Sequence, residues 1–91
     1  MLDYADEAQG EVYQIVRDLF YHQDCVRELR GVLKALVHQH GALHAADYRD
    51  AIGVGRKRAI QILEFFDRVG YTRRTRDARV LRVDSSWHDE G

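Results

Sequence analysis

The sequence is poor in the features that build disulfide-rich, secreted or membrane-spanning proteins. Its 91 residues include no proline and one cysteine, Cys25. A single cysteine excludes an internal disulfide and fits a reducing compartment. No apolar run approaches the roughly 20 residues that a membrane span needs, and the acidic N-terminus lacks the pattern of a signal peptide. We therefore expect one cytoplasmic domain, with at most a short piece of a neighbouring one, and a core too small to enclose an active site.

What the sequence does contain is an uneven distribution of charge. Residues 1–52 hold five basic and nine acidic side chains, whereas residues 53–82 hold nine basic and three acidic ones, a net charge of +6. Arginine supplies eight of those nine, and its planar guanidinium binds phosphate through paired hydrogen bonds and stacks on exposed bases. A basic segment in a neutral chain indicates either a polyanion-binding surface or a solvated charged face, and charge alone does not choose between them.

The apolar pattern predicts a mainly helical domain. Apolar residues recur at helical spacing along 24–40, 45–52 and 56–69. Asp24 is a candidate N-cap of the first helix, and Gly41 a natural stop, because glycine tolerates the left-handed conformation at a helix end. The last helix is expected to bury one stripe of side chains, with Phe65 at its edge, and the stripe consists of Ala59, Ile62, Leu63, Phe66 and Val69.

Short β-type segments surround these helices. Residues 42–44 fit one small strand, and two further strands, 71–75 and 78–83, flank a turn at Arg76-Asp77. Residues 11–22 are ambiguous, since their periodicity slightly favours a helix while their β-branched and aromatic content favours a hairpin. The predicted fold class is α+β, mainly α: a winged helix-turn-helix with a three-helix core, a small strand and a β-hairpin wing.

Basic residues gather at two places in this predicted fold. In helix-turn-helix proteins the start of the second motif helix meets the nucleic acid, and its free N–H groups and dipole favour phosphate there. We expect the helix start and the wing to lie at one end of the domain. They then form one patch of seven cations: Arg56, Lys57, Arg58, Arg73, Arg74, Arg76 and Arg79.

Other candidate sites are weak. His38, His40 and His44 suggest a metal, but residues two apart on a helix do not face one another, so surface or helix-end roles are expected and no metal site is predicted. Cys25 has no CxxC partner and is expected to be a small, half-buried residue. No nucleotide-binding fingerprint, phosphate loop or catalytic triad is present, so no catalytic residue is predicted.

The longest informative pattern runs from Tyr48 to Arg74. It includes a segment that reads RKxAIxxLExFDRxGxTRR, from Arg56 onward. The stretch from Ala46 to Arg82, which contains this pattern, resembles the C-terminal end of the bacterial selenocysteine-specific elongation factors, the SelB family. Upstream, Gly10–Val12 and Asp18–His22 are also similar to the family, and the resemblance covers about 10–82.

The resemblance implies a hairpin rather than a helix over 11–22, as the wing of a preceding winged helix. It therefore divides the chain into a remnant of that preceding domain at 1–22 (a helix end and a wing hairpin), a winged-helix RNA-binding domain at 23–83 and a flexible tail at 84–91. The family also implies a GTPase core elsewhere in the full factor, with GTP and Mg as its cofactors. The GTPase motifs are absent from these residues, so we expect no enzymatic activity and no cofactor in this stretch.

In this family the last winged helix is expected to bind the selenocysteine insertion hairpin (SECIS) of an mRNA, which directs selenocysteine incorporation at UGA codons. The expected partners are this hairpin and, through the parent protein, the ribosome and selenocysteyl-tRNA, with a monomeric domain. The implied RNA-binding set is Gly55, Arg56, Lys57, Arg58, Arg73, Arg74 and Arg76, with Arg49 as a neighbour.

One departure from the family concerns Gly55, where relatives often carry a small hydroxyl residue. Glycine is an acceptable N-cap, but a hydroxyl contact to RNA would be missing here. Two alternatives to RNA binding stay open: a DNA-binding transcriptional regulator, which would require a dimer and a palindromic site, and a winged helix that binds other proteins.

Overall fold

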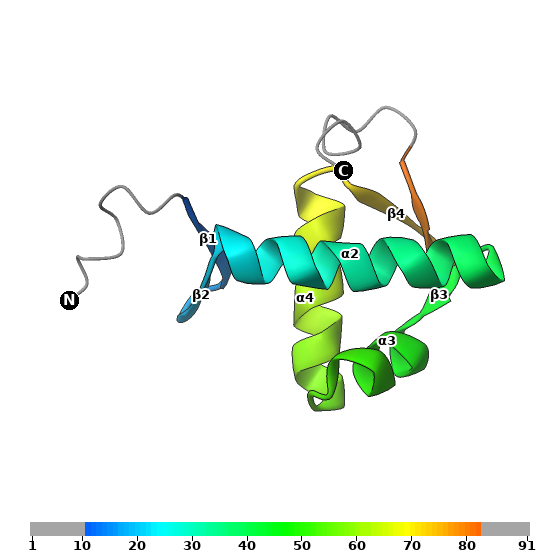
Figure 1. Ribbon diagram of the computed structural model, residues 1–91, viewed down its shortest axis with the longest axis horizontal. Coiled ribbons are helices and arrows are strands. Elements are labelled where there is room, and N and C mark those ends of the chain that lie inside the picture. The colour runs from blue at the N-terminus through cyan, green and yellow to red at the C-terminus, as the bar shows by residue number, and fades with distance from the viewer. Residues whose placement is uncertain (1–10, 83–91) are drawn as a thin grey trace.

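In the computed structural model, which describes residues 11–82, the chain starts as a β-hairpin that leads directly into a long helix (Figure 1). Strands β1 (Val12–Val16) and β2 (Leu19–His22) pair antiparallel around a two-residue turn. The hairpin predicted for 11–22 is therefore confirmed, against the helix that its periodicity favoured. The predictions made for 1–9 and for the tail 84–91 lie outside the described residues.

Helix α2 (Gln23–His40) begins one residue earlier than predicted. Its N-cap is His22, whose Nδ1 accepts a hydrogen bond from the amide of Asp24 at 3.1 Å. The prediction of Asp24 as N-cap is wrong because β2 runs straight into the helix, which leaves Asp24 in the first turn, paired with Arg27 at 3.2 Å. Gly41 ends the helix in the left-handed conformation at φ 85°, as predicted.

The remaining elements follow the predicted order. After α2 come β3 (Leu43–His44), α3 (Ala45–Ile52), α4 (Arg56–Arg68), β4 (Thr72–Thr75) and β5 (Ala78–Leu81). The last three strands form one antiparallel sheet in the order β3-β5-β4, so the small strand after α2 pairs with the returning strand of the second hairpin. This confirms a three-helix core with a small strand and a β-hairpin wing.

The core lies where α2, α3 and α4 meet. Leu33 of α2, Tyr48 of α3 and Phe66 of α4 are completely buried. The Tyr48 hydroxyl donates to the carbonyl of Leu29 at 2.8 Å, which satisfies its one polar atom inside the core. Burial raises the pKa of Tyr48, so this side chain is neutral and structural.

The β1–β2 hairpin packs against α4 and completes the core on that side. Ile15 is fully buried, and the ring of Tyr13 meets Phe65 edge-on at 5.8 Å. For this reason Phe65, expected at the edge of the stripe, is buried at 2% exposure. Val69, expected inside the stripe, is instead exposed because it follows the end of α4. The division of the chain at residue 22 into two domains stays a prediction.

Within residues 11–82, no helix is both long and apolar enough to cross a membrane.

Candidate nucleic-acid interface

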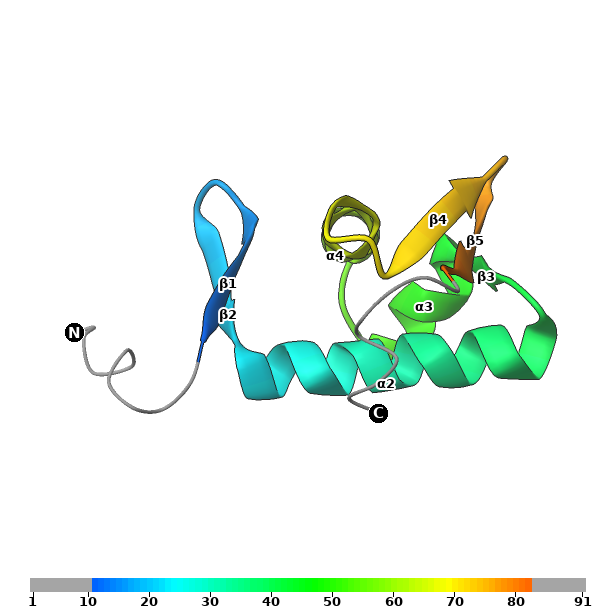
Figure 2. The same ribbon diagram turned by 90° about the horizontal axis from the view of Figure 1, so that it is seen from above.

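Helix α4 and the tip of the β4–β5 hairpin share the face of the molecule that points away from α2. Figure 2 looks along α4 and shows α2 on one side of it and the wing tip projecting to the other. β4 starts at the C-terminal end of α4 and runs outward from it (Figure 1). We expected the start of α4 and the wing at one end of the domain, whereas the wing is attached at the C-terminal end of α4, through Thr72 and Arg79 to Asp67.

The start of α4 is exposed and positively charged. Gly55 is its N-cap, and the side chains of Arg56, Lys57 and Arg58 are all exposed. The first N–H groups of a helix have no partner within the helix and carry its positive dipole end. Gly55 has negative φ, and a Cβ built on it meets nothing within 4 Å, so a hydroxyl residue would fit here without strain.

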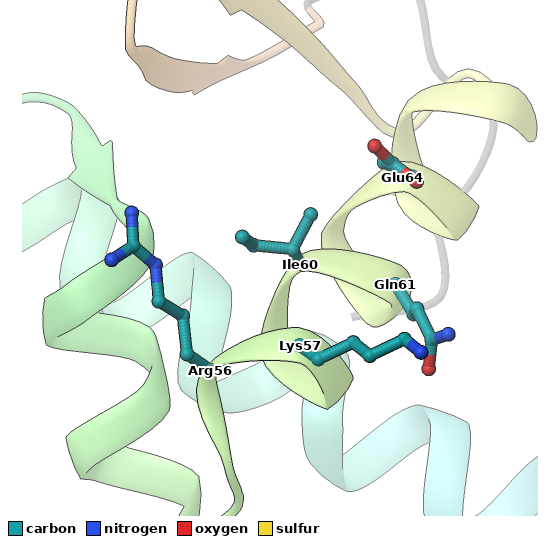
Figure 3. A pocket seen from close by; sticks show the side chains of 5 residues that line it. All are labelled: Arg56, Lys57, Ile60, Gln61 and Glu64. Carbon is teal, nitrogen blue, oxygen red and sulfur yellow. The ribbon is translucent and has the colours of Figure 1, made fainter.

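An open hollow of about 590 Å³ lies along α4 and begins at this helix start (Figure 3). It is lined by Arg56, Lys57, Ile60, Gln61 and Glu64. In Figure 3, Ile60 lies between Arg56 and Lys57, whose side chains point to opposite sides, and Lys57 runs toward Gln61. Two cations thus border an apolar side chain.

The hollow adds residues that the sequence reasoning missed. Ile60, Gln61 and Glu64 were not among the predicted site residues, since none of them is basic. The signal that would have found them is helical spacing, because positions three, four and seven residues beyond Lys57 continue its exposed face.

The wing presents three of the predicted cations at or near its tip. Arg73 and Arg74 lie on β4, where neighbouring side chains point to opposite faces, and both are exposed. Arg76 occupies the first position of the turn and has φ 60°, a left-handed conformation that non-glycine residues rarely adopt. Arg74 Nε donates to the Arg76 carbonyl at 3.1 Å, which ties the strand to the turn.

Arg79 is not part of the exposed patch, which corrects its inclusion among the seven cations. Its exposure is only 5%, and its guanidinium pairs with the Asp67 carboxylate through two contacts of 3.1 Å. Thr72 also donates its hydroxyl to Asp67 at 2.6 Å. This cluster attaches the wing to the end of α4, and its charges neutralise one another.

The other predicted site residues differ in how far their side chains are already engaged. Arg49 lies on α3, half-buried, with its Nε 3.1 Å from Asp50. Arg58 donates to Gln61 at 3.2 Å and to the Tyr21 hydroxyl at 3.4 Å. Within residues 11–82, no ion pair or hydrogen bond engages the side chains of the remaining exposed set, which consists of Arg56, Lys57, Arg73 and Arg76.

Residues outside this face offer little chemistry. The thiol of Cys25 is partly buried, and burial together with the nearby Glu28 carboxylate raises its pKa, which disfavours the reactive thiolate. His38, His40 and His44 are exposed. Over the part of the chain that the structure describes, no three metal-binding side chains gather in one place.

A three-helix core and a small strand paired with a β-hairpin that follows the last helix define a winged helix-turn-helix domain. The family described as "Elongation factor SelB, winged helix" matches this chain over residues 35–81. The chain therefore belongs to the SelB winged-helix family.

Individual relatives agree. The selenocysteine-specific elongation factor of Escherichia coli (strain K12) is 47% identical over 74 residues, 81% of this chain. That of Haemophilus influenzae (strain ATCC 51907 / DSM 11121 / KW20 / Rd) is 30% identical over 73 residues, 80% of this chain. The chain spans 12% of the length of each of these proteins.

Among solved structures, the mRNA-binding domain of elongation factor SelB from E. coli, in complex with SECIS RNA, matches with a TM-score of 0.77 and 47% sequence identity. The match covers 81% of this chain and 61% of that one.

Proposed function

We propose that this domain binds an mRNA hairpin of the SECIS type and serves, within a selenocysteine-specific elongation factor, to direct selenocysteine incorporation at UGA codons. The observation that supports this best is a set of exposed cations whose side chains have no ion pair or hydrogen bond within residues 11–82: Arg56 and Lys57 at the start of α4, and Arg73 and Arg76 on the wing. An exposed basic surface of this kind is suited to the phosphates of a folded RNA.

The choice of RNA over DNA is supported by the relatives rather than by the charges. A structure with 47% identity and a TM-score of 0.77 is a SelB domain in complex with SECIS RNA. We propose as the RNA-binding residues of this chain the set that the family resemblance implies: Gly55, Arg56, Lys57, Arg58, Arg73, Arg74 and Arg76, with Arg49 at the margin. Two of these residues should contribute less to RNA binding because their side chains already have partners. Arg49 contacts Asp50, and Arg58 contacts Gln61 and Tyr21.

In this proposal the domain is a binding module and performs no catalysis. GTP and Mg bind in another part of the parent protein, as do selenocysteyl-tRNA and the ribosome. The domain acts as a monomer, bound to a hairpin in the mRNA, and keeps the tRNA carried by its parent close to the UGA codon.

The proposal is tested by a gel shift of the domain with the hairpin that follows a selenoprotein UGA codon, against a hairpin of scrambled sequence. The native hairpin should bind more tightly. If about five phosphates are engaged, log K should fall with log salt at a slope of roughly −3.5 to −4.5. A flat salt dependence, or equal affinity for the scrambled hairpin, contradicts the proposal.

Variants locate the interface. The double variant Arg56→Ala/Lys57→Ala should weaken binding about 10- to 100-fold and reduce the salt slope by about 2, one for each lost phosphate contact. Arg27→Ala is the matched control, because Arg27 is an exposed arginine of α2, the helix on the opposite side from this face (Figure 2). Its affinity and slope should equal those of the unaltered domain.

The same binding experiment separates the two other functions. A DNA-binding regulator should retain duplex DNA more tightly than the hairpin and form a dimer in light scattering. A protein-binding winged helix should show no change in RNA retention when Arg73, Arg74 and Arg76 are replaced by glutamate.

A further inference from the structure

The two hairpins of the molecule end in the same dipeptide. Arg17-Asp18 joins β1 to β2, and Arg76-Asp77 joins β4 to β5, in each case between two directly paired residues. Arg17 is exposed, and within residues 11–82 its side chain has no ion pair or hydrogen bond. Within residues 11–82, each hairpin therefore presents at its tip one arginine whose side chain has no ion pair or hydrogen bond, although only Arg76 was among the implied RNA-binding residues.

The two tips also point in the same direction. In Figure 2, the turn of β1–β2 and the turn of β4–β5 both project away from α2, and α4 lies between them. The guanidinium of Arg58 reaches the Tyr21 hydroxyl of β2 at 3.4 Å, so the hairpin adjoins the basic start of α4. The exposed face of α4 is thus bordered on one side by the tip of β1–β2 and on the other by the tip of β4–β5.

The β1–β2 hairpin is held firmly in this position. Arg68 Nη2 donates to the carbonyls of Gln14 and Ile15 at 3.0 and 3.2 Å, and its guanidinium lies 5.5 Å from the centre of the Phe65 ring. Gln14 Nε2 donates to the Arg17 carbonyl at 3.2 Å. The pairing register shifts between Gln14 and Val16, a bulge that redirects the strand just before the turn. These contacts hold the hairpin, and with it Arg17, in one position relative to α4.

We propose that the β1–β2 hairpin is a second wing, in which Arg17 binds a backbone phosphate of the same RNA on the opposite flank of α4 from Arg76. The inference rests on the proposed function and assigns RNA contact to a segment outside the implied set. An RNA stem is broad enough to meet both flanks, whereas a single extended strand that follows one flank is not. Asp18, beside Arg17, limits the strength of the contact, as Asp77 does beside Arg76.

The test is a comparison of Arg17→Ala with Arg76→Ala, Arg27→Ala and the unaltered domain, all against the hairpin with its full stem. Arg17→Ala should weaken binding about 3- to 10-fold and reduce the salt slope by about 1, as expected for one lost phosphate contact. Arg17→Lys, which keeps the charge, should recover most of the slope. Thermal unfolding should be unchanged in both variants, since Arg17 is exposed.

The outcomes distinguish the two proposals. If Arg17→Ala matches the Arg27→Ala control while Arg76→Ala weakens binding, the second wing is refuted and the proposed function stands. If Arg17→Ala weakens binding without a change in the salt slope, Arg17 binds no phosphate and the inference is wrong. If the unaltered domain does not retain the hairpin at all, both proposals fail.

Discussion

The two hairpins share a turn sequence and a direction, but they are attached to the domain in different ways. The β4–β5 hairpin is attached through a buried ion pair, with Arg79 and Thr72 on the Asp67 carboxylate. The β1–β2 hairpin is attached through apolar packing, with Ile15 fully buried and Tyr13 against Phe65. Arg68 adds hydrogen bonds to the backbone of β1. Both attachments use neighbouring residues at the end of α4, Asp67 and Arg68.

This difference shows how the same helix end can serve two purposes. The negative charge of Asp67 neutralises Arg79. This reduces the repulsion between Arg79 and the other arginines of the wing. Arg74 and Arg79 are directly paired across β4 and β5, and like charges in that position are destabilising. Neutralising Arg79 leaves Arg74 and its neighbours available as the exposed positive charge of the wing.

The largest effect is expected from breaking the attachment of the wing. Asp67→Ala leaves the buried Arg79 without a counter-charge, a change that costs 3–5 kcal/mol in a fully buried pair. Asp67 is 26% exposed in its side chain, so we expect a loss of about 2–4 kcal/mol in the free energy of unfolding. Urea denaturation followed by circular dichroism measures it.

The control for this prediction removes both charges. The double variant Asp67→Ala/Arg79→Met should recover a large part of the lost stability, because an apolar side chain can fill the buried position of Arg79 without needing a partner. If the double variant is as unstable as Asp67→Ala, the ion pair is not what attaches the wing.

A smaller effect is expected from releasing the first hairpin. Arg68→Ala removes two hydrogen bonds to backbone carbonyls and a cation–π contact, while the apolar contacts of Ile15 remain. We expect a loss of about 1–2 kcal/mol in the free energy of unfolding. Hydrogen exchange should locate the loss, with faster exchange in residues 12–22 and little change in 72–81.

Arg68→Lys sharpens this prediction. Lysine keeps the charge but lacks the planar fork that spans two carbonyls, so it should recover less than half of the lost stability. Full recovery would mean that charge alone, rather than the paired hydrogen bonds, holds the hairpin to α4.

Most of the fold followed from the sequence because its signals are local. The helices were marked by apolar spacing, and two of them end at Gly41 and Gly53 in the left-handed conformation. The exposed cations at the start of α4 and on the wing also followed from helix and hairpin boundaries. The choice of a hairpin for 11–22 came from the family resemblance, since periodicity alone favoured a helix.

What the sequence did not reveal depends on contacts between distant residues. Arg79 looked like any other arginine of the basic segment until the fold placed it against Asp67, twelve residues away. Phe65 is buried because Tyr13, far along the chain, covers it. Nothing in the local sequence around either residue specifies its partner. The sequence pattern therefore could not distinguish a buried arginine such as Arg79 from an exposed one.

The smallest expected effect is a difference in stability between glycine variants of the two Arg-Asp turns. Arg76 has φ 60°, and within residues 11–82 it is the one non-glycine residue with a positive φ, so the wing turn is strained by about 1 kcal/mol while the Arg17 turn is not. Glycine relieves that strain but raises the entropy of the unfolded chain by about 0.4–1 kcal/mol. Arg76→Gly should therefore leave stability unchanged or slightly higher, whereas Arg17→Gly should lower it by about 0.5–1 kcal/mol.

Each variant removes one exposed arginine from a hairpin tip, so the loss of charge is matched and the difference reports backbone strain. For a domain of this size, a difference of about 1 kcal/mol corresponds to roughly 4–8 °C in Tm, which differential scanning calorimetry resolves. Equal Tm values would contradict the strain assigned to Arg76. The two variants should nonetheless both bind the RNA hairpin more weakly, because relieving the strain at Arg76 does not restore the charge that contacts phosphate.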